Sequence, residues 1–310
     1  MNELLAPVWT ERVTRLHLGV EPVDALGRPG PLGGLGLHVE HVPRPAPLPT
    51  GIPAPVPFGD IGDNAGLPGV AGSPSGRFAL TFGRAALDAL EAIVVRVVDP
   101  RRRYVPRRLS IPVPDLATVL AAEAAHDQDP AAALTPRTCR PTLFPGAAYG
   151  VAAGATAVRG RVIWGAGGPP VQWARVAALT EPIEIRAEDG TVTTVQPVLG
   201  RAHGDHRGEF LLVLGPLPTE LALGTSQTAD VVVRVTARPE PAPGAPVDSP
   251  TGSRADPLWH LPVERVASLD PADQVAAGTV EPAGFTASTV RTLTCRRGFP
   301  PRASFTFVLP

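Results

Sequence analysis

Apolar and polar residues alternate with a period of two in several stretches of this chain, a pattern typical of β-strands that bury one face. Residues 13–20 and 156–162 show it most clearly, and each run stops at a turn rich in Gly or Pro. Two Val-Val-Arg-Val runs, at residues 94–97 and 232–235, predict buried strands. An Asp-Gly pair between two alternating runs predicts an antiparallel hairpin over residues 183–192.

Helical patterning is scarce. Residues 85–92 predict one short helix. Residues 115–126 are a better candidate, because Asp115 can cap a helix after Pro114 and the run is rich in Ala, a strong helix former. We expect this second helix to connect two β domains.

A short pattern occurs twice and indicates an internal duplication. A small polar residue, two spacers, Gly, a charged residue and Phe run from Ser73 to Phe78 and again from Asp205 to Phe210. The two Val-Val-Arg-Val runs are separated by a similar length of chain. Because Ser or Asp can close a turn and Gly accepts backbone conformations that a Cβ disfavours, each copy predicts a turn that leads into a strand.

The predicted fold class is all-β, with two tandem antiparallel β-sandwich domains of the Ig-like or transthyretin-like kind. We place the first domain at residues 1–114, with a Pro- and Gly-rich insertion at 43–73. A helix and linker follow at 115–136. The second domain is expected at 137–310, with a Pro-rich insertion at 239–256. The chain length agrees with two domains, since a domain commonly has about 100–150 residues.

Composition limits the classes of function. The 310 residues include 39 Pro and 32 Gly, yet 44% are hydrophobic and 18% charged, so the chain can bury cores. The formal net charge is −1, which removes the general electrostatic argument for nucleic acid or an anionic membrane as a partner. The chain contains no Lys, so Arg supplies every basic side chain.

The N-terminal residues show no basic start followed by an apolar run, so no secretory signal is predicted. No apolar stretch reaches the roughly 20 residues of a membrane-spanning helix. We therefore expect a cytoplasmic protein. Its release from the cell as part of a particle stays an open alternative. Cys139 and Cys295 are interpreted as free thiols, because two Cys cannot form a dense disulfide framework, although a single bridge between them stays open.

The densest polar cluster, residues 203–209, offers a candidate zinc site. His206 and Glu209 have a His-x-x-Glu spacing used by some zinc peptidases, and His203 adds another imidazole. The corresponding turn at Ser73 contains neither His nor Glu, so the feature that the two copies share is structural. We therefore assign no catalytic, cofactor-binding or metal-ligating residue and expect no cofactor, and a zinc hydrolase remains a third hypothesis.

Arginines are concentrated at residues 101–108, with Tyr104 among them. Such a run can bind phosphate. In a chain without Lys, however, an exposed edge or a contact with a partner subunit is the more common explanation.

Other polar and aromatic candidates favour ordinary structural roles. Alternation places His38 and Glu40 on one strand face and His41 on the other, which argues against a shared ligand set, so all three are interpreted as surface residues. No nucleophile elbow, Walker loop or dinucleotide fingerprint occurs, and the Gly-rich residues 32–37 precede no helix. The four Trp could form a sugar-binding platform, but burial is their more usual role; they are Trp9, Trp164, Trp173 and Trp259.

Three segments resemble the carboxypeptidase regulatory-like domain, a transthyretin-like β-sandwich. They are the turn at 205–210, the strand at 231–235 and the C-terminal stretch 290–310. That family opens with a Gly-x-Val strand, as in residues 160–162 here, and closes on an apolar-Leu-Pro pattern. The Pro-rich insertions depart from the family, and residues 239–287 have no counterpart in it. The resemblance implies a non-catalytic domain used for folding support, adhesion or assembly.

Residues 103–106 and 144–162 also resemble components of phage-tail-like contractile injection systems. This likeness implies a cap or tail-end component. We therefore expect a non-catalytic structural subunit, homo-oligomeric, which binds other protein subunits through extended arms and edge strands. We expect no nucleic-acid partner. The alternative function is a carbohydrate-binding or adhesive β-sandwich module, which would need an exposed pair of Trp.

Overall fold

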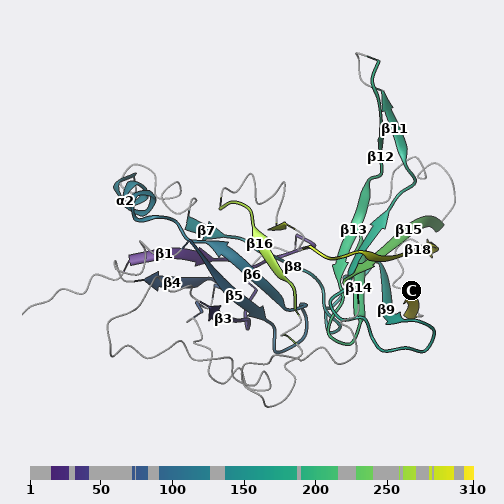
Figure 1. The fold of residues 1–310 in the computed structure, drawn as a ribbon, viewed down its shortest axis with the longest axis horizontal. Coiled ribbons are helices and arrows are strands. Elements are labelled where there is room, and N and C mark those ends of the chain that lie inside the picture. Colours follow the sequence, from purple (N-terminus) through teal and green to yellow (C-terminus); the bar gives the residue numbers. More distant parts are fainter. Residues whose placement is uncertain are drawn as a thin grey trace, which may run out of the picture.

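The computed structural model describes most of the chain between Arg15 and Pro310. The described residues are 15–27, 32–41, 72–73, 75–82, 91–125, 137–186, 190–215, 228–239, 258, 261–269, 279–280, 283–296 and 304–310. This part is mostly β-strand arranged in several small sheets, with one short helix (Figure 1). No helix in the described part is long and apolar enough to span a membrane.

One group of strands forms a three-stranded and a five-stranded sheet, with strand orders β4-β1-β7 and β17-β16-β6-β5-β3. Two further short strands, β2 and β8, pair with each other in parallel. The strands of this group are β1 (Arg15–Val20), β2 (Val23–Asp24), β3 (Gly36–His41), β4 (Phe78–Phe82), β5 (Ala92–Val98), β6 (Arg107–Pro112), β7 (Thr138–Cys139), β8 (Thr142–Leu143), β16 (Val263–Val266) and β17 (Thr279–Val280).

A second group forms a four-stranded and a three-stranded sheet, with strand orders β13-β10-β15-β18 and β14-β9-β19. A two-stranded hairpin, β11-β12, extends from this group. The strands are β9 (Thr156–Trp164), β10 (Arg175–Leu179), β11 (Ile183–Arg186), β12 (Val192–Val195), β13 (Val198–His203), β14 (Glu209–Leu214), β15 (Thr228–Ala237), β18 (Ala287–Arg296) and β19 (Ser304–Leu309).

The two groups share one pairing scheme. Strand β1 lies between antiparallel β4 and parallel β7, as β9 lies between antiparallel β14 and parallel β19. The antiparallel series β3-β5-β6 corresponds in the same way to β10-β15-β18. The two Val-Val-Arg-Val runs lie on the equivalent strands β5 and β15. This correspondence agrees with the duplication predicted from the sequence.

The repeated turn is present in both copies with matching geometry. In each copy the first residue donates its N–H to the carbonyl four residues later, and the Gly N–H donates back to the first residue's carbonyl. The distances are 2.8 and 2.9 Å for the turn at Ser73, and 2.9 and 3.1 Å for the turn at Asp205. Gly76 and Gly208 have φ values of 71° and 72°, in the left-handed region that favours glycine.

Two large apolar cores form, because alternate residues of the sheets point inward. The first core belongs mainly to the first group of strands but also contains Ala157, Leu211 and Val213 from β9 and β14 of the second. Leu18, Val95 and Ile111 lie in the first core. Val176 and Val233 lie in the second, to which both sheets of that group contribute. A smaller third cluster consists of Val105, Trp173, Leu258 and Leu261.

The predicted local elements are found where the structure describes them. Helix α2 (Leu116–Ala125) forms within residues 115–126, and the Asp115 carboxylate accepts a hydrogen bond from the Thr118 N–H at 2.7 Å. This bond caps the helix and lowers the pKa of Asp115. The hairpin predicted from Asp-Gly is β11-β12, with a φ of 86° at Gly190. The short helix predicted at 85–92 falls largely outside the described residues.

Strand pairing crosses the expected division at residues 115–136. Strand β7 pairs with β1, and β16 pairs in parallel with β6, so segments from beyond residue 137 complete sheets of the first group. The division into domains at 1–114 and 137–310 stays a prediction from the sequence. In Figure 1, β16 lies beside β6 as part of the same sheet.

Candidate functional site, an arginine-lined groove

A buried ion triad joins the two groups of strands. Glu264 on β16 accepts two hydrogen bonds from Arg107 on β6. The Arg107 Nε donates to Oε1 of Glu264 at 3.3 Å, and Nη2 donates to Oε2. Arg175 on β10 donates to the same Oε1 at 3.1 Å. The three side chains are nearly inaccessible to solvent, with exposed fractions of 2%, 2% and 9% for Arg107, Glu264 and Arg175. A carboxylate buried this deeply requires such partners, because an unpaired charge is costly away from water.

His203 on β13 lies in the same region. Its ring stacks on Phe144 with the centroids 3.9 Å apart, and the Arg107 guanidinium lies 5.7 Å from the centroid of Phe144. Burial, followed by the positive charges of Arg175, Arg107 and Arg201, lowers the pKa of His203 well below its usual 6.5. His203 is therefore neutral near pH 7, in a region where positive charge is in excess.

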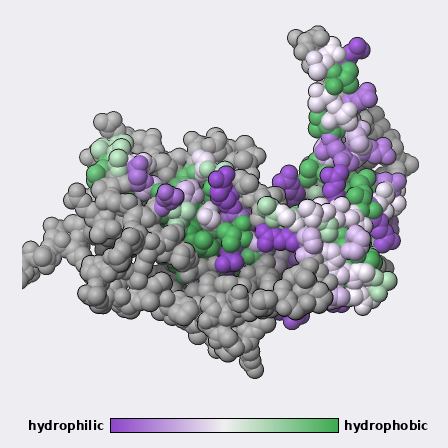
Figure 2. Space-filling view, viewed as in Figure 1, coloured by the Kyte–Doolittle hydropathy of each residue, from purple (hydrophilic) through white to green (hydrophobic). Residues whose placement is uncertain are grey.

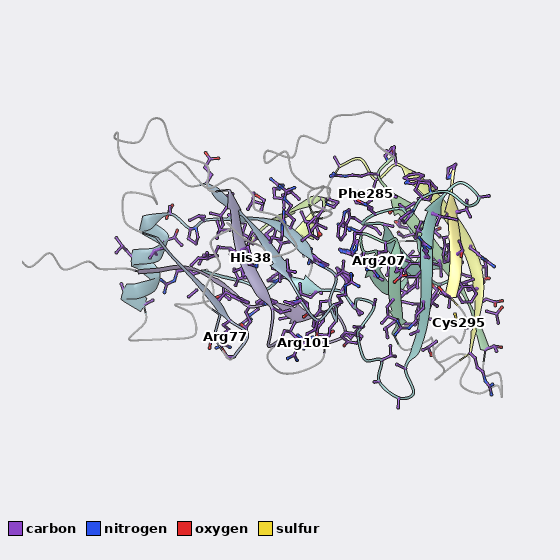
Figure 3. The ribbon with its side chains drawn as sticks, turned by 90° about the horizontal axis from the view of Figure 1, so that it is seen from below. His38, Arg77, Arg101, Arg207, Phe285 and Cys295 are labelled. Carbon is purple, nitrogen blue, oxygen red and sulfur yellow. The ribbon has the colours of Figure 1, made fainter. Side chains whose placement is uncertain are left out.

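A groove of about 1260 Å³ lies beside this junction. One wall comes from the segments around β2 and β8, and the other from β10, β13 and β15. Phe285 lies in its lining, 5.0 Å from Arg175 and 5.6 Å from Arg238, each measured from the guanidinium carbon to the ring centroid. Figure 3 places Phe285 on the side of the second group that is nearer to the first.

Three arginines of this groove, Arg175, Arg201 and Arg234, come from one face of the four-stranded sheet. Val176 and Val233 point into the second core, so their neighbours Arg175, Ala177 and Arg234 point to the opposite face. Ala177 is paired with Arg201 on one side and Arg234 on the other. Two exposed arginines thus flank a small residue across three adjacent strands.

The cluster at 203–209 forms a turn. The Asp205 carboxylate accepts hydrogen bonds from the N–H groups of Arg207 and Glu209 at 2.8 and 3.0 Å. His203 is buried against Phe144, whereas the centroid of the His206 ring is 6.2 Å from that of Trp173. Among the residues that the structure describes, no three His, Cys, Asp or Glu side chains are grouped so as to hold a metal ion. The turn that the sequence predicted in this cluster is present.

The run at 101–108 is not a continuous binding strip. Arg101 and Arg102 are exposed, but Arg103 donates to Asp99 at 2.9 Å. Arg107 is buried in the triad with Glu264, which corrects the expectation that the whole run is exposed. The reason is the strand period of two, which turns Arg107 inward, while Tyr104 is held by a hydrogen bond from its hydroxyl to Asp24 at 2.9 Å.

His38 on β3 differs from the surface residue expected. A register shift between Val39 and His41 interrupts the simple alternation. His38 is half-buried, and burial, followed by the charge of Arg96, lowers its pKa. The side chains of Glu40 and His41 lie outside the described part of the structure.

Both cysteines are free and buried, as expected of unpaired thiols. Cys139 belongs to the first core and Cys295 to the second, so they do not meet. Burial raises the pKa of Cys139 to about 12 and also raises that of Cys295.

The tryptophans form no exposed pair in the described part of the chain. Trp173 is buried, with 2% of its surface exposed and a φ of 60°, and Trp164 is half-buried beside the second core. Trp9 and Trp259 lie outside the described residues.

Sequence reasoning missed three arginines of the groove and the carboxylate of the adjacent triad, which are Arg175, Arg201, Arg234 and Glu264. One signal was available, because Arg234 interrupts a run of valines and a strand period of two turns it away from the core. Nothing local indicates that Glu264 would reach Arg107 and Arg175.

Comparisons with known proteins identify no family. No protein-family model matches the chain, and no curated protein matches it. One similar solved structure is a 9R-lipoxygenase from Cyanothece PCC8801, 13% identical, with 50% of this chain and 16% of that chain covered and a TM-score of 0.21. Another is a streptococcal ancillary pilin, 11% identical, with 97% of this chain and 63% of that chain covered and a TM-score of 0.22.

The chain spans less than two thirds of the length of either protein. It is a β-rich protein that distantly resembles the ancillary pilin. A likeness at this level supports no inference about activity or partners.

Proposed function

We propose that this protein is a non-catalytic structural subunit that binds neighbouring subunits of a multi-protein particle. The observation that carries the proposal is the hairpin β11-β12, which projects away from both cores (Figure 1). All four residues of β12 are exposed. Figure 2 shows hydrophobic residues along this projection, coloured green.

Two valines of the hairpin and one at the start of β13 are exposed. The exposed fractions are 52% for Val192, 38% for Val195 and 46% for Val198 at the start of β13. A two-stranded hairpin by itself is marginally stable in water, and packing against another surface stabilises it. Val192 and Val195 lie on opposite faces of the ribbon, three residues apart on β12, so each face offers one exposed valine that a neighbouring subunit can cover.

A second surface supports the same role. Strand β18 is at the edge of its sheet, and Val290 on it is 56% exposed. An open edge with unpaired backbone groups can accept a strand from another chain.

The finer expectations belong to this proposal. The two groups of strands are proposed to be two β-sandwiches, and the protein to form a homo-oligomer within a larger assembly. The particle that we propose is a phage-tail-like contractile injection system, because of the resemblance found in the sequence. In it the protein would be a cap or tail-end component, and assembly would take place in the cytoplasm.

The proposal is tested by substituting the exposed valines of the hairpin. Wild-type protein purified gently from its native producer should elute in a complex much larger than the 32.2 kDa chain, together with other subunits. The variant Val192→Asp/Val195→Asp should lose that complex, because a charge replaces each buried apolar contact. The measurement is size exclusion with light scattering, followed by mass spectrometry of the co-eluting proteins.

The matched control is Leu120→Asp, which places a charge at an equally exposed apolar residue on α2. We expect this control to assemble like the wild type. A wild-type protein that elutes as a 32.2 kDa monomer without companions would refute the proposal.

A further inference from the structure

The groove carries an excess of positive charge. Five of its lining residues are arginines, and no Asp or Glu is among the lining residues described. Three of them are held by two carboxylates next to the groove. Glu264 is shared by Arg107 and Arg175, and Glu21 is shared by Arg140 and Arg77.

The remaining two arginines of the groove, Arg201 and Arg234, are exposed. Arg234 donates to the Gln196 side chain at 3.3 Å, a neutral partner that leaves its charge uncompensated. Ala177 separates the two on the sheet. Neighbouring strands are about 4.8 Å apart, so the Cα atoms of Arg201 and Arg234 are about 10 Å apart. The small Ala177 side chain leaves room between the two arginines.

We propose that this groove, with Arg201 and Arg234 on its sheet face, binds an acidic, extended polypeptide segment of a neighbouring subunit. The inference rests on the proposed function and names the chemistry of one partner. Arginine suits this role because its planar guanidinium pairs with a carboxylate through two parallel hydrogen bonds.

The size of the groove favours a polypeptide over a small anion. Pockets for small molecules commonly have volumes of about 300–1,000 Å³, and the groove has about 1260 Å³. Its lining also includes the exposed apolar side chains of Leu26 and Val198. An acidic peptide that contains apolar residues can satisfy both kinds of lining.

The aromatic rings of the groove argue against nucleic acid. Binding of single strands commonly uses open aromatic faces on which bases stack. Phe144 is already stacked on His203 and approached by Arg107, and Phe285 is approached by Arg175 and Arg238. Carboxylates need only the guanidinium groups and leave these ring contacts in place.

The direct test measures binding of fluorescein-labelled poly-L-glutamate by fluorescence anisotropy at low ionic strength. We expect saturable binding that the variant Arg201→Glu/Arg234→Glu weakens by at least about tenfold, since two attractive contacts become repulsive. The control variant Arg161→Glu/Arg207→Glu changes the net charge equally at exposed arginines that do not line the groove. It should bind like the wild type.

The same titration is repeated with oligodeoxythymidylate of matched charge and with inorganic phosphate. Weaker binding of both than of poly-L-glutamate is expected. If the oligonucleotide binds more tightly than poly-L-glutamate, the groove is a nucleic-acid site and the inference is wrong. If phosphate displaces poly-L-glutamate at an equal total concentration of negative charge, the groove is a small-anion site and the inference is also wrong. Absence of poly-L-glutamate binding, or equal weakening in both variants, would also overturn it. Both double variants should keep the wild-type circular dichroism and melting temperature, because all four arginines are exposed.

Incorporation into the native complex separates this inference from the proposed function. If the wild type co-elutes with other subunits and Arg201→Glu/Arg234→Glu does not, both are supported. If both proteins co-elute equally, the inference fails while the proposed function stands. If the wild type is a lone monomer, the proposed function fails.

Discussion

The turn at Asp205 shows how much of the structure is determined by single residues. Its Gly208 has a positive φ and fits where a larger residue would not, because an added Cβ would lie 2.5 Å from the carbonyl oxygen of Val162 and 3.1 Å from that of Val171. The turn was predictable from sequence, since the requirement for Gly and a capping carboxylate is local. The close approach of Val162 and Val171 was not, since those residues come from another part of the chain.

We expect Gly208→Ala to lower the free energy of unfolding by about 2–4 kcal/mol, through backbone strain and steric overlap together. Chemical denaturation followed by circular dichroism measures this change. Gly154→Ala is the control, because Gly154 also has a positive φ, of 81°, but no atom lies within 4 Å of the added Cβ. It should cost about 1 kcal/mol. Equal losses in the two variants would show that packing around Gly208 contributes nothing.

His203 predicts a pH dependence of stability. Its pKa in the folded protein is lowered, chiefly by burial, so the unfolded chain binds a proton more readily than the folded chain. Its contribution to stability is therefore fully present above about pH 6.5, the unfolded value, and is lost as the pH falls below it. The variant His203→Phe keeps an aromatic ring against Phe144 but has no group that binds a proton.

Urea unfolding of the wild type and of His203→Phe between about pH 5 and pH 7.5 tests this expectation. The wild type should lose stability as the pH falls below about 6.5, with a slope steeper than that of the variant by up to about 1.4 kcal/mol per pH unit. His38 and His206 also have lowered pKa values, so a smaller slope should remain in the variant. Identical slopes would contradict the assignment.

At the scale of elements, local sequence predicted what depends on neighbouring residues. The Asp-Gly hairpin, the Asp115-capped helix and the valine-rich strands all form. Their conformations follow from backbone preferences and from alternation. The placement of β16 was not predictable in this way. It pairs with β6 through three residues, and Glu264 lies 157 positions along the chain from Arg107.

Glu264 should be a main determinant of how β16 is held. Glu264→Ala would leave Arg107 and Arg175 buried without their shared carboxylate. We expect a loss of about 3–5 kcal/mol in the free energy of unfolding, the usual cost of removing one partner from a buried ion pair. Glu209→Ala, at an exposed position, is the control and should change stability by about 0.5 kcal/mol or less. Denaturant titration measures the free energy of unfolding of both variants. Similar small losses of stability in the two would show that the triad contributes little to stability.

At the scale of the whole molecule, two groups of strands with one pairing scheme meet through shared apolar clusters and a buried ion triad. The buried triad draws on β6, β10 and β16, so it connects sheets of both groups. A junction of this kind fixes the shape of the adjacent groove, while the hairpin β11-β12 projects away from it. The proposed contacts with neighbours therefore involve three surfaces, which are the apolar hairpin, the edge strand β18 and the basic groove.

The sequence by itself determined the β-rich class, the repeated turn and the hairpin. These features depend on composition and on residues close together in the chain, so they can be derived without knowing where distant segments lie. Only the tertiary structure decided that Arg107 is buried, that β16 joins the sheet of β6, and that five arginines line one groove. Each of these depends on which remote segments pack together, and that choice follows from burial and charge pairing summed over the whole chain.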